Sequence, residues 1–247
     1  MPAPTFWAAA DPLAAARTLA PEIRAAADET EAQRQIPKAL VERLRDAGLF
    51  HMTLPKDVGG LECDPVTAAR VVEEIAAADG STAWVVMLAN QTTFFAAYLP
   101  PEQCRLFWGN GAINCGVARP IGRAVPASDG GYTVSGRWPF ASGSSHADWF
   151  MGECLVYPDG GSEPLKGDDG NPVVKDAIFT RDEVTVLDTW YTTGLRGTAS
   201  HDFSVEDVRL PAERILQMGG AHHPWVGFKG GPLFVMNHGS HALGLAR

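Results

Sequence analysis

The texture of the amino-acid sequence changes once, near Pro100, and this change limits the folds that the chain can adopt. Before it, Ala, Glu, Arg and Leu recur with the spacing of amphipathic helices. After it, short alternating runs are separated by clusters of Gly, Asp, Asn and Pro, as in strands joined by turns. The sequence therefore predicts an α+β protein, in which an N-terminal helical domain precedes an antiparallel β-barrel or sandwich.

Four runs before Pro100 predict helices. Helical periodicity covers residues 11–31, 37–48 and 65–79, and a nearly apolar run follows at 82–99, for which Ser81 is the expected N-cap. A helix that is apolar on most sides is either buried in a bundle or lines a ligand cavity. The pattern alone does not separate these two alternatives.

The strand-like runs begin after a segment rich in Pro and Gly, which starts at Asn114 and precedes a hairpin turn at Asp129-Gly130. We expect this segment to be a loop with accessible backbone N–H groups. The predicted strands lie at 131–136, 149–157, 173–179, 183–188 and 202–211. The expected division is a helical domain at 1–110, a β-barrel domain at 111–220, and a linker with the start of a further helical domain at 221–247.

Charge and hydropathy exclude several classes of function. The formal net charge is −9, from 29 acidic and 20 basic residues, so a phosphate backbone would be repelled and nucleic acid is not an expected partner. No apolar run approaches the roughly 20 residues that span a bilayer, and no secretory leader pattern is present, so we expect a cytoplasmic protein without a membrane partner. The four cysteines form no CxxC pair and are expected to be free and mostly buried.

Common catalytic motifs do not occur in this sequence. It lacks a strand-associated GxGxxG, a P-loop, HExxH and GxSxG, which argues against the usual phosphate cradles and hydrolase elbows. His238 with His241, and the neighbours His222 and His223, could ligate a metal. No carboxylate lies at a matched spacing, so surface or cavity histidines are favoured and no metal is expected.

The densest signal lies between residues 114 and 149. A Pro/Gly segment, a hairpin turn at 129–130 and a strand ending in small hydroxyl residues would suit a flat aromatic ligand with polar edges. The alternative is an ordinary barrel rim, with the aromatic residues in the core and the serines forming turns.

Four stretches of the chain resemble the acyl-CoA dehydrogenase superfamily of flavoproteins, in order and in spacing: 37–60, 72–84, 131–149 and 193–216. Within this superfamily, DGGYTVSGRWPFASGSSHADW at 129–149 is most similar to flavin-dependent monooxygenases that hydroxylate aromatic or heteroaromatic compounds. Such enzymes use reduced flavin from a separate reductase. The resemblance implies N-terminal helices, a middle β barrel and a C-terminal four-helix bundle that builds a homotetramer.

The resemblance also implies where flavin, as FAD or FMN, would bind. Ser142 falls where a hydroxyl faces flavin N5, and Phe140 falls beside the ring. The implied cofactor-binding residues are Val117, Ala118, Gly122, Phe140, Ala141 and Ser142. A hydroxyl within about 3 Å of N5 can stabilise charge on reduced flavin or its oxygen adduct, because a fixed dipole in a dry pocket needs little reorganisation. The alternative for Ser142 is a serine that merely ends a strand.

Other implied site residues carry alternatives of their own. His146 is a candidate catalytic residue, or it fixes a turn through a backbone hydrogen bond. The implied substrate-side residues are Trp84, Trp190, Arg196 and Thr198. Arg196 would orient an anionic substrate or flavin, or it would pair with Asp202 or Glu206.

Three departures from the family pattern bear on the function. Residues 118–120 replace the acidic loop of the dehydrogenases, which disfavours α,β-dehydrogenation of an acyl thioester. Residues 89–92 occupy a window where several aromatic hydroxylases place a histidine, so the general base is unassigned. The chain ends at Arg247, where family members continue for roughly another domain, so the C-terminal bundle is expected to be missing or only begun.

Three functions follow from these observations. We favour a flavin-dependent monooxygenase that takes reduced flavin from a reductase and acts on a small molecule. The first alternative is an FAD-dependent acyl-CoA dehydrogenase. The second is an incomplete or non-catalytic subunit, since an exposed apolar face would call for a partner that supplies the missing helices. The chain is expected to form a homo-oligomer or to pair with such a helical partner.

Overall fold

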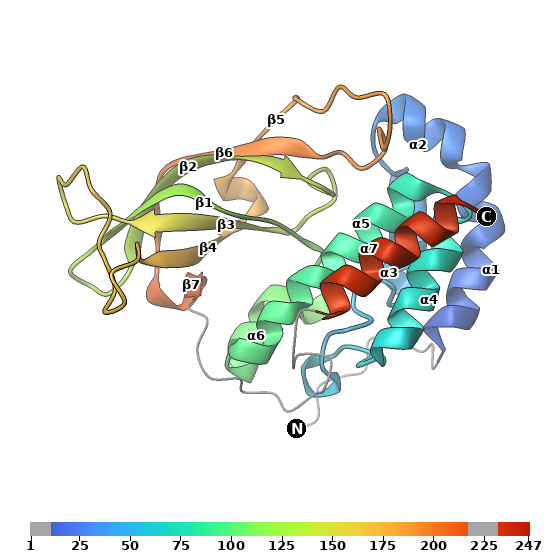
Figure 1. Ribbon diagram of the computed structural model, residues 1–247, viewed down its shortest axis with the longest axis horizontal. Helices are drawn as coiled ribbons and strands as arrows, with labels where there is room; N and C mark the ends of the chain where they lie inside the picture. The colour runs from blue at the N-terminus through green and yellow to red at the C-terminus, as the bar shows by residue number, and fades with distance from the viewer. Residues whose placement is uncertain (1–10, 217–231) are drawn as a thin grey trace. The chain divides into compact units, whose positions relative to one another are not determined.

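The computed structural model describes residues 11–216 and 232–247 (Figure 1). The chain divides into two compact units, each described here by itself. The helical unit comprises Met1–Ile113, Tyr191–Ala199 and Gly220–Arg247, and the sheet unit comprises Asn114–Trp190 and Ser200–Gly219. The helical unit is discontinuous, because the chain leaves the sheet unit after Trp190 and returns to it at Ser200.

The helical unit contains seven α-helices among its described residues. They are α1 (Pro12–Ala25), α2 (Ala27–Gln33), α3 (Lys38–Asp46), α4 (Pro65–Ala76), α5 (Gly80–Thr92), α6 (Pro101–Trp108) and α7 (Pro232–Leu245). Short 3-10 turns lie at η1 (Lys56–Val58), η2 (Thr93–Tyr98) and η3 (Gly109–Gly111). The expected helix at 82–99 therefore ends as an α-helix at Thr92 and continues as 3-10 turns.

The N-terminal caps show why these helices begin where they do. The Asp11 carboxylate accepts the backbone N–H of Leu13, and Asp64 caps α4 in the same way. At α5 the predicted cap, Ser81, was wrong. Asp79 caps this helix instead, because its carboxylate accepts the backbone N–H of Thr82 at 2.6 Å. The negative charge of the carboxylate also interacts favourably with the positive, N-terminal end of the helix dipole.

The interior of the helical unit is apolar and continuous. Its largest fully buried side chains include Ile23, Ile36, Leu44, Leu49, Phe50 and Met52. Helix α5 is buried on most of its surface, which favours the bundle-interior alternative of the sequence analysis. Among the described helices, none combines the length and the apolarity that crossing a lipid bilayer requires.

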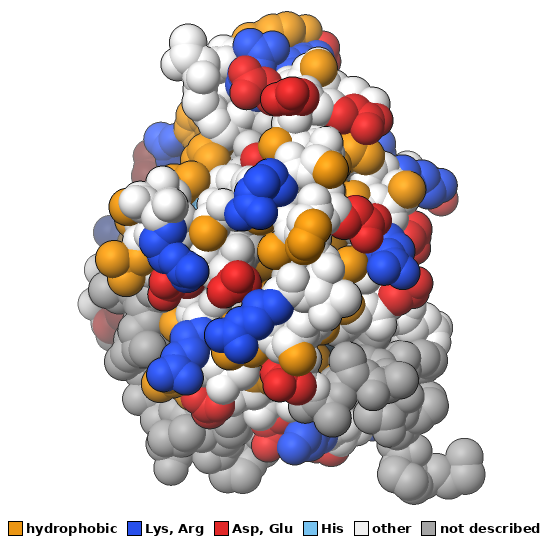
Figure 2. Space-filling view, turned by 90° about the vertical axis from the view of Figure 1, so that its right-hand side faces the viewer, with side chains coloured by type: hydrophobic (Ala, Val, Ile, Leu, Met, Phe, Trp, Pro, Cys, Tyr) orange, Lys and Arg blue, Asp and Glu red, His pale blue; other side chains and the backbone are white. Residues whose placement is uncertain are grey.

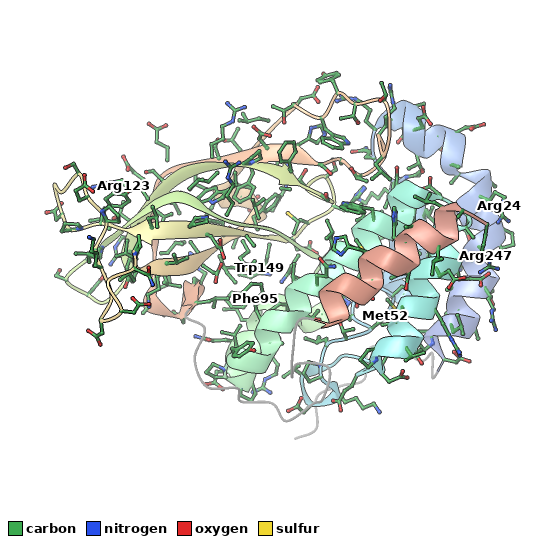
Figure 3. The ribbon with its side chains drawn as sticks, in the orientation of Figure 1. Arg24, Met52, Phe95, Arg123, Trp149 and Arg247 are labelled. Atoms are coloured by element: carbon green, nitrogen blue, oxygen red, sulfur yellow. The ribbon has the colours of Figure 1, made fainter. Side chains whose placement is uncertain are left out.

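Exposed charges of opposite sign alternate over the helical unit. Arg17 lies 3.8 Å from Glu74, and Arg247 (labelled in Figure 3) lies 2.9 Å from Glu73. On the face displayed in Figure 2, Lys and Arg side chains are interspersed with Asp and Glu. Because solvent-exposed pairs contribute at most about 1 kcal/mol each, the apolar core stabilises this unit more than the surface charges do.

Helix α7 packs closely on α4, along which it runs in Figure 1. Gly244 permits this approach. A Cβ at that position would lie 2.5 Å from the Cβ of Ala76 and would overlap the carbonyl oxygen of Glu73. The side of α7 that carries Gly239 has no atom within 4 Å of where a Cβ would lie.

Gly244→Ala is therefore expected to lower the free energy of unfolding by about 1–3 kcal/mol, because the added methyl group overpacks the α4–α7 contact. Gly239→Ala is the matched control and is expected to raise it by up to about 1 kcal/mol through helix propensity. Urea denaturation of both variants measures the difference. Equal stabilisation by both substitutions would contradict the close contact.

The sheet unit is built on one seven-stranded sheet. Its strands are β1 (Asn114–Pro126), β2 (Tyr132–Ala141), β3 (Trp149–Val156), β4 (Val174–Thr180), β5 (Thr185–Leu187), β6 (His201–Leu210) and β7 (Ile215–Leu216). The spatial order is β5-β6-β2-β1-β3-β4-β7. Five neighbouring pairs are antiparallel and β1 with β3 is parallel, so the sheet is mixed. Short 3-10 turns η4 (Arg181–Glu183) and η5 (Ala212–Arg214) follow β4 and β6.

The prediction of a Pro/Gly loop between Asn114 and the hairpin turn at Asp129-Gly130 was wrong, since residues 114–126 form the central strand β1. The Pro and Gly residues of this segment shift its pairing with β3, but the strand continues to Pro126. Val117 pairs with Gly152 and Gly122 pairs with Cys154, so residues 118–121 face a single residue of β3 and leave the register. Pro120 lies in this interruption, where its missing N–H costs no ladder hydrogen bond.

Trp138 is the centre of the sheet unit's core and is fully buried. Its ring stacks on Phe203 with centroids 4.9 Å apart, and its Nε1 donates a hydrogen bond of 2.8 Å to the carbonyl oxygen of Glu153. Three glycines on β1, β2 and β3 make room for the indole, because a Cβ on any of them would overlap it or lie within about 2.6 Å of it: Gly122, Gly136 and Gly152.

A buried carboxyl on β4 makes the stability of the chain dependent on pH. Asp176 is 5% exposed and lies opposite Glu153 on β3. Burial, together with the Glu153 carboxyl, raises the pKa of Asp176 to about 7. Because the unfolded chain releases this proton near pH 4, the protonated form stabilises the fold below that pH, and this contribution is lost as the pH rises to about 7.

Asp176→Asn is expected to remove this pH dependence, since the amide keeps the volume and carries no charge. Between pH 5 and pH 8 the variant should gain on the order of 2 kcal/mol of unfolding free energy relative to the parent chain. Urea denaturation at the two pH values measures this gain, with the exposed Asp182→Asn as the control. A parent chain equally stable at both values would contradict the assignment.

Candidate functional site

A β-bulge in β2 shapes the candidate site of the sheet unit. Trp138 pairs with Phe203 and Ala141 pairs with His201, so β2 has two residues where β6 has one. Phe140 lies in the bulge with a φ of 65°, in the left-handed region that an aromatic residue rarely adopts. Its ring is 65% exposed. The bulge therefore directs a large aromatic side chain outward, as bulges next to active sites do.

Trp190 contacts this ring. The Phe140 and Trp190 centroids lie 6.1 Å apart with the planes at 81°, an edge-to-face arrangement. The backbone N–H groups of Thr189 and Trp190 both donate to Nδ1 of His201 at 3.2 Å. Oδ1 of Asp188 lies 3.5 Å from the same ring nitrogen. His201 thus fixes the segment that holds Trp190, a role that the sequence analysis missed.

Ser142 lies two residues beyond the bulge and is 8% exposed. Its Oγ lies 2.6 Å from Oγ of Ser200, which is 3% exposed. Ser142 was predicted from the sequence and Ser200 was not, although Ser200 ends the same GLRGTAS motif that contains Arg196 and Thr198. The two serines are 58 positions apart, so only the pairing of β2 with β6 reveals their contact.

His146 closes the turn that follows Ser142. Its backbone N–H donates to the carbonyl oxygen of Gly143 at 2.9 Å, and the N–H of Ser144 donates to Ala141 at 3.1 Å. This is the backbone hydrogen bond that the structural alternative for His146 required. A catalytic role for its ring stays a prediction.

The residues predicted at the ring's edge, on β1, take different positions. Val117 is half-buried at the last paired position before the interruption, and Ala118 is exposed within it. Gly122 is buried beneath the Trp138 indole, where a Cβ would overlap both that ring and Cys154. Packing accounts for glycine at position 122, so the interruption at 118–121 is the part of β1 that offers backbone groups outside the ladder.

The remaining predicted residues lie in the helical unit. Trp84 on α5 makes edge-to-face contacts with His238 and His241 on α7, with centroids 5.5 and 5.2 Å away. Nε2 of His241 lies 2.9 Å from the carbonyl oxygen of Gly80. These two histidines pack on an aromatic ring, whereas His222 and His223 lie outside the described residues.

Arg196 and Thr198 lie in the segment that leaves the sheet unit. Arg196 Nε is 4.0 Å from Glu31 on α2. Asp202, one of the two alternative partners expected for Arg196, pairs with Arg137 at 2.8 Å within the sheet unit. The Thr198 side chain is buried and donates to the Leu195 carbonyl oxygen at 2.9 Å.

The structure thus brings part of the predicted site together within one unit. Phe140, Ala141, Ser142 and Trp190 share the sheet unit, and Trp84, Arg196 and Thr198 share the helical unit. In the sheet unit, an exposed aromatic ring, a buried hydroxyl pair and backbone outside the ladder fit a flat ring with polar edges such as an isoalloxazine.

Thiol and metal chemistry receive little support. Burial raises the pKa of Cys104 and Cys154 to about 12 and that of Cys63 to about 11, and it raises the pKa of Cys115 further, so the four thiols are neutral at pH 7. All four are free, as predicted. Over residues 11–216 and 232–247, no group of three or more His, Cys, Asp or Glu side chains could hold a metal ion.

The strained conformation of Phe140 can be tested directly. Gly usually destabilises a strand by about 0.5–1 kcal/mol relative to Ala, but at a φ of 65° this order should reverse. We expect Phe140→Gly to be more stable than Phe140→Ala by about 1 kcal/mol in thermal or urea unfolding. Greater stability of Phe140→Ala would contradict the bulge.

Known proteins share this sequence pattern over much of the chain. Residues 13–105 match the family model for the acyl-CoA dehydrogenase N-terminal domain. The chain is 35% identical over 209 residues to the flavin-dependent monooxygenase oxygenase subunit HsaA of Mycobacterium tuberculosis, which covers 83% of this chain and 50% of that protein. It is 31% identical over 195 residues to the oxygenase component of an FADH2-dependent resorcinol hydroxylase of Rhizobium sp., covering 78% and 46%.

Solved structures of flavin-dependent monooxygenases also have a similar fold. A crystal structure of the HsaA monooxygenase from M. tuberculosis aligns with a TM-score of 0.82 and 30% identity, covering 96% of this chain and 65% of that one. XiaF from Streptomyces sp., solved with FADH2 and glycerol, aligns with a TM-score of 0.74 and 28% identity, covering 83% and 50%. The chain spans about half the length of the curated relatives it matches. Its fold is that of the acyl-CoA dehydrogenase superfamily, and its sequence is similar to flavin-dependent monooxygenases of that fold.

Proposed function

We propose that this chain is the flavin-binding part of a monooxygenase that hydroxylates an aromatic or heteroaromatic small molecule. The observation that carries the proposal is the juxtaposition in the sheet unit of the exposed Phe140 ring with the buried pair Ser142 and Ser200. The relatives support it, since they include an oxygenase subunit, a resorcinol hydroxylase and an indole-3-acetate monooxygenase.

Each site residue then has a role that follows from its position. A bound reduced flavin would supply the electrons that activate molecular oxygen. The Ser142 hydroxyl would hydrogen-bond to N5 of the ring, and Phe140 with Trp190 would cover the ring and exclude water. Backbone groups of residues 118–121 would meet the ring's polar edge, because they are outside the sheet ladder.

The proposal includes a second protein component. Two of the relatives are named as an oxygenase subunit and an oxygenase component, which supports a separate flavin reductase as partner. Homo-oligomeric assembly, placement in the cytoplasm and the choice between FAD and FMN stay predictions.

An acyl-CoA dehydrogenase is the second candidate, favoured by the family model that matches residues 13–105. Against it, residues 118–120 carry no carboxylate.

One experiment separates the candidates. The purified chain is titrated anaerobically with reduced and oxidised FMN and FAD, and air is then admitted with resorcinol or indole-3-acetate as probe substrate. We expect flavin binding and an oxygen-dependent hydroxylated product. Reduction of bound flavin by an acyl-CoA would favour the dehydrogenase, and no flavin binding would favour the incomplete subunit.

Ser142→Ala tests the proposed role of the hydroxyl. We expect the substitution to lower hydroxylated product per reduced flavin consumed, or to raise hydrogen peroxide release, by about tenfold, with little change in unfolding temperature. Product and peroxide are measured in the same reaction. Ser204→Ala, a half-buried serine on β6, is the control. Unchanged coupling in Ser142→Ala would remove this residue from the mechanism.

A further inference from the structure

Ser200 is a hydroxyl partner of Ser142. The two Oγ atoms are 2.6 Å apart, at the short end of the range for O–H···O hydrogen bonds, and both side chains are buried. Buried hydroxyls in folded proteins are usually hydrogen-bonded, and in this contact each serine hydroxyl provides a partner for the other.

The register of the sheet places the two serines together. The last pair of the antiparallel β2–β6 ladder is Ala141 with His201, so Ser142 and Ser200 adjoin this pair just beyond the end of β2 and the start of β6. Their hydroxyl contact of 2.6 Å is therefore made outside the ladder. His201 also anchors this end of β6, because its Nδ1 accepts the N–H groups of Thr189 and Trp190.

We propose that Ser200 is a positioning residue that sets the direction of the Ser142 hydroxyl proton toward the flavin N5 atom. This inference rests on the proposed flavin site. In a hydroxyl pair, one oxygen donates and the other accepts. When Ser200 donates, the Ser142 proton can point at an acceptor. When Ser142 donates to Ser200, it presents lone pairs to a donor.

This choice matters for a flavin because N5 changes its hydrogen-bonding role. N5 of the oxidised ring is an acceptor, and the same atom carries a proton in the reduced ring. Rotation of the two hydroxyls would let Ser142 satisfy both forms without movement of any heavier atom. Loss of Ser200 would remove one of the contacts that orient the Ser142 hydroxyl, and a misdirected hydroxyl weakens a preorganised site.

The test uses flavin labelled with 15N at N5, bound to the purified chain in the oxidised and reduced states. The 15N chemical shift reports hydrogen bonding at this atom and is independent of turnover. We expect Ser200→Ala to move the N5 shift toward the value of Ser142→Ala in at least one redox state, with flavin affinity changed less than tenfold. The double variant should match Ser142→Ala, because the two residues act through one hydroxyl.

Conservative variants and a control separate positioning from packing. Ser200→Thr keeps the hydroxyl and should retain the 15N shift of the parent chain. Ser200→Cys keeps a weak donor without an added methyl group, and its shift should lie between those of the parent chain and Ser200→Ala. Ser204→Ala, on the same strand, should leave the shift unchanged.

The outcomes distinguish the two proposals. If Ser142→Ala moves the N5 shift and Ser200→Ala does not, the positioning role of Ser200 is overturned while the flavin site stands. If neither moves it, Ser142 does not contact N5 and both roles fail. Absence of flavin binding to the parent chain would overturn the proposed function and this inference together.

Discussion

The indole of Trp138 occupies the space that three glycines leave between β1, β2 and β3, and the geometry of the candidate site follows from that burial. The stacked Phe203 and the hydrogen bond to the Glu153 carbonyl oxygen fix both the height and the orientation of the ring. With Trp138 held opposite Phe203, the next paired position is Ala141 with His201. The extra residue on β2 must bulge between these two anchors, which turns Phe140 outward and leaves Ser142 opposite Ser200.

Part of this arrangement could be predicted from the sequence, for identifiable reasons. The helices and most strands carry strong periodicity, and the stretch at 129–149 resembles one family closely enough to select Phe140 and Ser142. Strand β1 was missed because two Pro and two Gly interrupt its 13 residues. Those residues serve an interruption at 118–121 and a packing site for Trp138 at Gly122, and a single sequence does not separate such uses from a loop.

The residues that sequence reasoning missed are those that depend on register. Ser200 and His201 become neighbours of Ser142 and Ala141 only in the register that β2 and β6 adopt after the bulge between Trp138 and Ala141. A shift of one residue would place each of them on the other face. Asp79 was overlooked as the cap of α5 for a local reason, because Asp and Ser are comparable N-caps and the choice was settled by the hydrogen bond to Thr82.

The path of the chain adds a mechanical consequence. Residues 191–199 belong to the helical unit, and the residues on either side of them, Trp190 and Ser200, belong to the sheet unit. One of these flanking residues touches Phe140 and the other touches Ser142. A force on the segment 191–199 would therefore act directly on both neighbours, Trp190 at one end and Ser200 at the other, and so on both parts of the candidate site.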